Sequence, residues 1–473
     1  MKPTSHLRGA NLAVVSVMFV AIAVCLGLEP AKAQDSTEAN ARLQRGKVAT
    51  LYEKVTDNVP GRSLANTIRI LRETHTDLVF RGFWAEWFPT PDSPENIAPE
   101  LRDFIAERGK LDPAQVPAVI RREGFYYDRL RDHIAAIKRE MPNVIFIGSF
   151  PAQRITRVAR NPITGKILSA DETWRIALGP EKWKLQREGK PITKEEFQRW
   201  LAKTGWTTDQ PRDDPRKFEA YFPDITNPEF QELLLSWAKK QIDCGADGVW
   251  IDGLEAQPFF LDMITDDPAH PAVKESLAAC AKVVDAIHRY GQTKGKHVYV
   301  ASWARPHAAY LFRNRAGNWD DAFTHIERWS VPPPQLDFVT LGPLNEEVLA
   351  QKLDQPKWDR QMVSVHKLYG DTPVFAFLDW AFNESQTVYF SQKLSKDEQR
   401  QLLKTLDAAY AKMGVNFIYP VHGGYMGSGP ITTKLAFGTQ RSYDSLAPEF
   451  DTYETIRELA RKKAEGGKIK GGE

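Results

Sequence analysis

The sequence predicts an α/β protein, a (β/α)8 TIM barrel with long βα-loop insertions. Short apolar runs alternate with amphipathic helices, and several of those helices end at a glycine just before the next run, which is typical of parallel βα units. The alternative, an open doubly wound sheet, lacks the glycine-rich phosphate loop that would favour it. Residues 78–421 span the expected strands, more than the roughly 250 residues of a bare barrel.

The elements follow in chain order. The apolar runs assigned directly as strands are 78–83, 144–147, 218–222, 248–251, 298–301, 374–378 and 417–421. The helices, which repeat apolar residues every three to four positions, are expected at 63–74, 126–140, 228–243, 273–290, 345–369, 396–413 and 453–463. The excess length falls in 89–125 and 151–217, on the side of the barrel where βα loops build substrate clefts.

One further strand is needed between residues 302 and 371, and two runs compete for it. Residues 336–341 (LDFVTL) are the more apolar and have the better β-propensity. Residues 322–326 (AFTHI) place Glu327 directly after the strand and precede a rigid proline triplet that could wall a cleft. We expect 322–326 to be the sixth strand, and the role of Glu327 depends on this choice.

Residues 1–33 are expected to be a cleaved secretory signal. Lys2 and Arg8 precede the apolar run 12–28, and Ala31 and Ala33 are the small residues that a signal peptidase requires. The protein is therefore expected in the periplasm or outside the cell, with cleavage after Ala33. An uncleaved membrane anchor is the alternative, because the apolar run is just long enough to span a bilayer.

The expected mature chain has three parts: a flexible lead-in at 34–60, a single catalytic barrel domain at 61–465, and a disordered tail at 466–473. The full chain carries a net charge of +2, and the basic excess lies in the signal segment. A neutral mature protein has no global field to attract nucleic acid or anionic lipid, so neither is expected as a partner.

Cys244 and Cys280 are the cysteines that remain after the signal. An oxidising compartment permits a disulfide between them, but we favour two buried free thiols on neighbouring helices. The cysteines and histidines form no zinc-binding motif, and neither a metal nor an organic cofactor is expected.

Candidate site residues are those that directly follow the apolar runs, because the carboxyl ends of barrel strands carry the active site. Asp252 and Glu327 are the expected catalytic pair. The expected substrate-binding residues are Trp84, Glu86, Trp303, Arg305, Asp379, Trp380 and His422. A pair of carboxyl groups is what glycoside hydrolysis requires, and indole faces stack on sugar rings. The pattern therefore favours carbohydrate chemistry.

The stretch 223–255 resembles the nucleophile region of barrel glycoside hydrolases. It is most similar to the clan of α-glucosidases and α-galactosidases, in which "D-x-T-N-P" precedes "G-x-D-G-x-W-x-D". This resemblance implies that Asp252 is the nucleophile, and the faint echo of a "W-x-G-D" run makes Asp321 a competitor for the acid. The chain departs from the pattern at Leu254, and too few residues precede residue 78 for that clan's β-sandwich.

A looser resemblance is to glycoside hydrolase family 114, the polygalactosaminidases. That family has a glutamate at the sixth strand, which implies a role for Glu327 here. The expected function is an exported glycoside hydrolase that cleaves a polysaccharide or oligosaccharide with a carboxylate pair. The alternative is a catalytically silent carbohydrate-binding barrel, in which the same acids only accept hydrogen bonds from hydroxyl groups.

Overall fold

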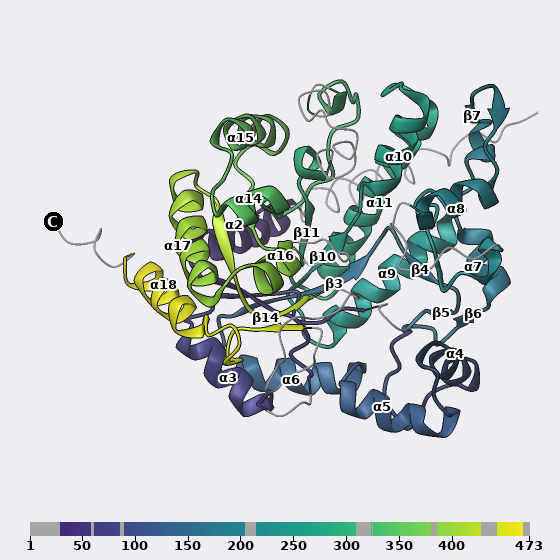
Figure 1. Cartoon of the computed structure of the whole chain (residues 1–473). Helices are drawn as coiled ribbons and strands as arrows, with labels where there is room; N and C mark the ends of the chain where they lie inside the picture. Colours follow the sequence, from purple (N-terminus) through teal and green to yellow (C-terminus); the bar gives the residue numbers. More distant parts are fainter. Residues whose placement is uncertain are drawn as a thin grey trace, which may run out of the picture.

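The computed structural model describes residues 29–57, 61–85, 89–203, 214–308, 323, 325–379, 386–426 and 442–466. Eight parallel strands form a closed barrel, with helices between successive strands (Figure 1). The TIM-barrel prediction is therefore confirmed.

The barrel closes because its first and last strands pair in parallel, with Ala49 opposite Ile418. In order around the barrel, the strands are β1 (Ala49–Tyr52), β2 (Leu78–Phe80), β3 (Ile145–Pro151), β10 (Gly248–Asp252), β11 (Tyr299–Trp303), β12 (Phe338–Leu341), β13 (Val374–Ala376) and β14 (Asn416–Tyr425). A short strand, β15 (Ser442–Asp444), adds to β14 in the antiparallel direction. Closure brings the carboxyl ends of all eight strands to one mouth.

The main helices lie where the sequence predicts them: α3 (Leu64–Glu73), α6 (Tyr127–Glu140), α9 (Pro228–Asp243), α11 (Pro271–Thr293), α17 (Lys396–Lys412) and α18 (Tyr453–Glu465). The expected helix at 345–369 is divided into two, α14 (Asn345–Ala350) and α15 (Gln355–Tyr369). Their apolar faces pack on the outside of the barrel. The interior holds a separate aromatic cluster that includes Phe80, Trp250, Phe338 and Phe377. The ring of Trp250 meets Phe80 and Phe377 edge to face, so the interior is a filled core.

The extra chain length forms two insertions after β2 and β3, as expected. The first carries α4 (Pro99–Gly109) and α5 (Val116–Glu123). The second carries α7 (Ala170–Ile176), α8 (Lys194–Lys203) and the short strand pairs β4–β9, β5–β6 and β7–β8. Both lie toward the right of Figure 1. The ion pairs Arg157–Glu107 and Arg108–Glu219 tie them together.

The prediction of a flexible lead-in at 34–60 is wrong. This segment contains most of helix α2 (Glu29–Arg45) and the first barrel strand, β1. Ala39 and Leu43 of α2 are buried in the cluster that fills the barrel interior, and the Tyr299 hydroxyl donates to the Ala39 carbonyl over 2.8 Å. Within residues 37–45 of this helix, Ala39 and Leu43 are the buried residues, so this part of the sequence looks polar, and β1 has only four residues. Helix α2 and strand β1 are therefore recognised from their contacts with the rest of the barrel and not from the sequence pattern.

We expect Leu43→Ala to lower the free energy of unfolding by about 2–4 kcal/mol, because it leaves a cavity under the barrel. Leu43 is only 2% exposed. Urea denaturation measures the change. Leu349→Ala is the matched control, since Leu349 is 45% exposed and its truncation should cost little. Equal losses in the two variants would show that α2 does not contribute to the core.

The prediction of a barrel strand at 218–222 is also wrong. Ala220 and Tyr221 form β9, which pairs antiparallel with β4 (Ile155–Thr156) inside the second insertion. The run is apolar because Phe218, Tyr221 and Phe222 are all buried there. A short buried run in an insertion has the same pattern as a barrel strand. The barrel still has eight strands, because β1 takes the place of this run.

The sixth strand is β12, not residues 322–326. Phe338–Leu341 pairs in parallel with the fifth strand, β11, and with the seventh, β13. Residues 325 and 326 are helical, and Glu327 follows them in a turn. His325 and Trp329 both donate to the buried carboxylate of Asp262, so this segment is packed against helix α10 (Ala256–Thr265). The more apolar run therefore forms the strand, as its β-propensity favoured.

Both cysteines are buried and free, which confirms the preferred interpretation of the pair. Burial raises the pKa of the Cys244 thiol to about 12. Residues 1–28 lie outside the described part, so the expected signal segment is not placed. Cleavage after Ala33 would fall within the range of α2. Among the helices of the described ranges, none has the length and apolar character needed to cross a membrane.

Candidate active site at the mouth of the barrel

Asp252 lies at the carboxyl end of the fourth strand, as predicted. One carboxylate oxygen accepts from the Gln153 amide at 2.7 Å, and the other accepts from the indole N–H of Trp303 at 2.8 Å. Gln153 follows β3 and Trp303 ends β11, the two strands that flank β10. The barrel therefore orients this carboxylate from both sides, as a group that acts on a bound substrate requires.

Gly253 is the residue that lets the chain turn directly after Asp252. Its φ of +61° is in the left-handed region, where glycine is favoured. A Cβ at this position would lie 2.5 Å from Oε1 of Gln153. Glycine thus allows the amide of Gln153 to approach the carboxylate of Asp252.

Arg81 is a site residue that the sequence analysis missed. It directly follows β2, with a φ of +56°, and its side chain is 2% exposed. Its guanidinium lies 4.5 Å from the ring centre of Trp84 and 4.9 Å from that of Trp250. A buried arginine with left-handed backbone is costly, and strain of this kind gathers at functional sites. The run LVFRGF, taken as one continuous strand, hid the break at this residue.

Two carboxylates at the mouth hold Arg81 in place. Glu53, which directly follows β1, lies 3.0 Å from one guanidinium nitrogen, and Asp379, beyond β13, lies 3.5 Å from the other. Glu53 also accepts from the backbone N–H of Gly424. Asp379 was predicted as a site residue and Glu53 was not. The rule that found Asp379, an acid just after an apolar run, would have found Glu53 if residues 48–52 had been recognised as a strand.

The two described tryptophans predicted to bind substrate are almost fully buried. Trp84 is 6% and Trp303 is 7% exposed. The ring of Trp303 stacks on Phe377 with 4.9 Å between the centroids and 17° between the planes. Both rings therefore form the wall behind Asp252 and Arg81, with only a small part of each surface open to a ligand.

Arg305 was predicted to bind substrate, and in the structure its side chain is engaged in a buried ion pair. Its guanidinium makes two hydrogen bonds to Glu255, at 3.1 and 2.5 Å, and a third to the Val331 carbonyl. The side chain is 1% exposed. Burial alone would lower the pKa of Arg305, but the charge and hydrogen bonds of Glu255 raise it. Arg305 is thus an internal ion-pair partner that anchors the segment after β11.

His422 is at the predicted strand end but is only 2% exposed. It lies between two carboxylates, 3.4 Å from Asp57 and 3.6 Å from Asp444. Asp444 also binds the buried Arg62. Burial raises the pKa of Asp444, but its contact with His422 and the charge of Arg62 outweigh that effect and lower the pKa to about 2. This network joins β14 to β15 and to the loop after β1.

Because the pKa of Asp444 is lowered in the folded state, we expect the protein to lose stability in acid. Its pKa is about 2 in the folded state against an ordinary 3.8, so it stabilises the fold above pH 4 and that contribution disappears as the pH falls toward 2. The expected loss is about 2 kcal/mol of unfolding free energy. Urea titrations at several pH values measure it. Asp444→Asn should be less stable at pH 7 and lose less on acidification; the same acid-dependent loss in both proteins would contradict this assignment.

Glu327 does not follow a strand, and this removes the ground for assigning it as the general acid. Its residue is exposed, and its carboxylate accepts from Ser364 at 3.2 Å and from Lys367 at 3.3 Å, both on α15. The expectation that Glu327 lies at the mouth depended on a strand at 322–326. Glu86, Trp380 and Asp321, the other predicted site residues, lie outside the described residues.

The stretch that resembles a nucleophile region has a structural role except at its end. Asn227 caps α9 by accepting from the backbone of Glu229, and Asp224 accepts from Gln257 over 3.0 Å. Asp247 accepts from the Phe146 N–H and pairs with Lys138 at the opposite end of the same strand. Asp252 differs from these residues because it ends a barrel strand.

No model of a known protein family matches the chain, and no curated protein matches it. Solved structures similar to it are glycoside hydrolases with barrel folds. The glycoside hydrolase domain of PelA from Pseudomonas aeruginosa is 13% identical, with 61% of this chain and 83% of that chain covered and a TM-score of 0.31. An α-amylase from H. orenii is 14% identical, with 89% and 83% covered and a TM-score of 0.44.

Endo-glycoceramidase II from Rhodococcus sp. is also similar, at 14% identity, with 87% and 78% covered and a TM-score of 0.37. Similarity this distant assigns no substrate or catalytic residue to the chain. The barrel is assigned from the strand pairings of this chain, and the candidate site is assigned from the contacts of its own residues.

Proposed function

We propose that the protein is an exported glycoside hydrolase that cleaves a polysaccharide or oligosaccharide at the mouth of the barrel. The observation that carries the proposal is the geometry of Asp252. It ends the fourth strand, and each of its oxygens accepts a hydrogen bond from a neighbouring strand or loop. An oriented carboxylate at this position suits a nucleophile, or a charge stabiliser for an oxocarbenium-like transition state.

The group around Arg81 supports a carbohydrate substrate. Glu53 and Asp379 each pair with the guanidinium, so their carboxylates are suited to accept hydrogen bonds from sugar hydroxyl groups. The adjoining rings of Trp84 and Trp303 offer apolar edges to the C–H faces of a sugar.

The general acid is proposed to be Glu86 or Asp321. Glu86 directly follows Ala85, whose backbone N–H donates to Ser149 of β3, next to the strand that ends in Asp252. Asp321 keeps its place as a competitor from the sequence resemblance. Glu53 and Asp379 are not proposed as the acid, because both carboxylates are engaged in ion pairs with Arg81.

The test is the release of reducing ends from a panel of exopolysaccharides by the chain that begins at Gln34. We expect hydrolysis of at least one glycan by the wild type and a strong loss in either Glu86→Gln or Asp321→Asn. The variant lacking the acid should retain activity on aryl glycosides with good leaving groups, which need no protonation. Glu327→Gln is the matched control and should stay active. Wild-type activity in both the Glu86 and the Asp321 variant would reject both residues as the acid.

The alternative is a carbohydrate-binding barrel without activity. The pairing of Glu53 and Asp379 with Arg81 favours it, because acids held in ion pairs bind hydroxyl groups without doing chemistry. Binding of a glycan with no product release would support this alternative and contradict the hydrolase.

The proposal of export is tested separately: cell fractionation and N-terminal sequencing should find mature protein that begins at Gln34 in the periplasm or medium.

A further inference from the structure

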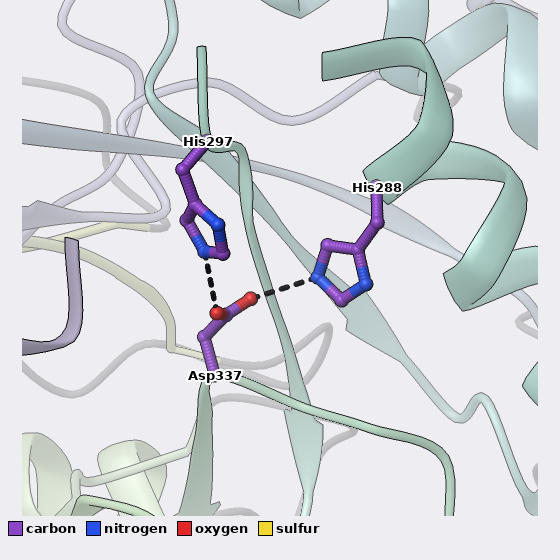
Figure 2. A group of neighbouring side chains, drawn as sticks. All are labelled: His288, His297 and Asp337. Atoms are coloured by element: carbon purple, nitrogen blue, oxygen red, sulfur yellow. Dashed lines mark hydrogen bonds and ion pairs between the residues drawn. The ribbon is translucent and has the colours of Figure 1, made fainter. Parts of the chain in front are cut away.

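Two histidines and one aspartate meet at the end of the barrel opposite Asp252. His288 lies in the last part of α11, His297 precedes β11, and Asp337 directly precedes β12. Figure 2 shows the two imidazole rings turned toward the carboxylate of Asp337. The three come from the amino-terminal side of the strands, so this cluster is separate from the mouth and does not depend on the proposed function.

The side chains are arranged so that one small ion could contact all three. The Nε2 atom of His288 lies 2.9 Å from one oxygen of Asp337, and the Nε2 atom of His297 lies 2.6 Å from the other. The ligand atoms all lie within 4.8 Å of one another. Two ligands on a tetrahedral zinc ion are separated by roughly 3.3 Å, given bonds of about 2.0–2.1 Å, so insertion of an ion would shorten the longest separation between ligand atoms by at most about 1.5 Å.

The charge and orientation of Asp337 suit a metal ligand. Burial raises the pKa of Asp337, but the hydrogen bonds from His288 and His297 outweigh it and lower the pKa. The backbone N–H of Val300 donates to the same carboxylate at 2.7 Å and holds it in place. Hydrogen bonds of this kind from outside the ligand set are a common feature of metal sites, where they fix the direction of the ligating group.

The cluster is also accessible. The side chains of His288 and His297 are 19% and 17% exposed, and that of Asp337 is 8% exposed. Solvent can therefore supply a fourth ligand. Zinc with two imidazoles, one carboxylate and one water matches the ligand types and the coordination number that this metal accepts.

We propose that His288, His297 and Asp337 form a binding site for a zinc-type divalent cation. The ion would join the end of α11 to the starts of β11 and β12. Residues 294–298 connect α11 to β11, whereas a long segment after Trp303 connects β11 to β12. It would replace the protons that the two Nε2 atoms now share with Asp337.

The residues are far apart in the sequence, which is why their spacing gave no motif and no metal was expected. His288 is 49 residues and His297 is 40 residues from Asp337. Only the closure of the barrel brings the starts of the fifth and sixth strands together.

The test uses tag-free protein that begins at Gln34, stripped with EDTA and titrated with zinc chloride at pH 7.5. We expect one zinc per chain to remain after gel filtration. We also expect the midpoint temperature of thermal unfolding to rise by about 2 °C or more with zinc in excess. His288→Ala and His297→Ala should each lower zinc affinity at least tenfold. His366→Ala is the matched control, since His366 is exposed on α15 and is not one of the three clustered ligands.

Cobalt(II) gives a readout that needs no variant. Visible absorption bands of a four-coordinate site should appear with the wild type at one equivalent and disappear on addition of zinc. Failure to retain zinc and absence of these bands would overturn the proposal and leave the cluster as a hydrogen-bonded clamp. Full zinc binding by a folded His288→Ala/His297→Ala double variant would overturn it as well, by placing the metal elsewhere.

Discussion

Replacing Asp252 with asparagine should lower kcat/KM on the glycan that the wild type hydrolyses by about 10³-fold or more. This is the scale of effect expected when a group that acts directly on the reacting bond is removed. Asparagine keeps the shape of the side chain but cannot attack the anomeric carbon or stabilise its developing positive charge. The measurement is the initial rate of reducing-end release by the purified variant.

The fold should tolerate the Asp252 change with a modest cost. The Gln153 amide and the Trp303 indole both donate to this carboxylate, and an asparagine can accept from only one of them through its oxygen. We expect about 1–2 kcal/mol less stability. Asp285→Asn, at an exposed position of α11, controls for the loss of one negative charge. Wild-type activity in Asp252→Asn would remove this residue from the mechanism and, with it, the basis of the proposed function.

Breaking the buried pair of Glu255 and Arg305 should cost about 3–5 kcal/mol of unfolding free energy, because one charge is then left buried without its partner. Both side chains are at most 6% exposed. Glu255→Gln and Arg305→Met are each expected to show this loss in urea denaturation. The double variant should be more stable than the sum of the two single losses predicts, since it leaves no unpaired charge.

An exposed pair provides the control for this experiment. Glu458 and Lys462 lie on α18 with side chains 51% and 61% exposed, and Glu458→Gln should leave the stability almost unchanged. The comparison also decides the role of Arg305. A variant at this position that kept its stability but bound glycan more weakly would return Arg305 to the substrate-binding set that the sequence suggested.

The repeating pattern of the chain was enough to predict the class of fold. Helices closed by glycine and followed by apolar runs predict parallel strands, and most helices lie within a few residues of their expected positions. It was also enough to place Asp252, because GVWID is fully apolar up to its acid and can only be a buried strand. These features are local, so a reading along the chain can detect them.

The strand at each disputed position was decided by tertiary structure. Residues 49–52, 220–221 and 338–341 are all short and apolar, and which of them joined the barrel depended on the partners available to their backbones. A run of four residues has too few side chains to show whether it faces a barrel, an insertion or a helix. The positions of Glu53 and Glu327 followed from that outcome.

The sequence by itself determined the barrel, its two insertions and the acid at the end of the fourth strand. The tertiary structure decided which charged residues face the mouth. Arg305 turns inward to Glu255, whereas Arg81 pairs with Glu53 after the neighbouring strand β1 and with Asp379 beyond β13. An ion pair between strands distant in the chain leaves no local pattern, because its partners are chosen by the closure of the barrel. The same closure brings His288, His297 and Asp337 together at the opposite end.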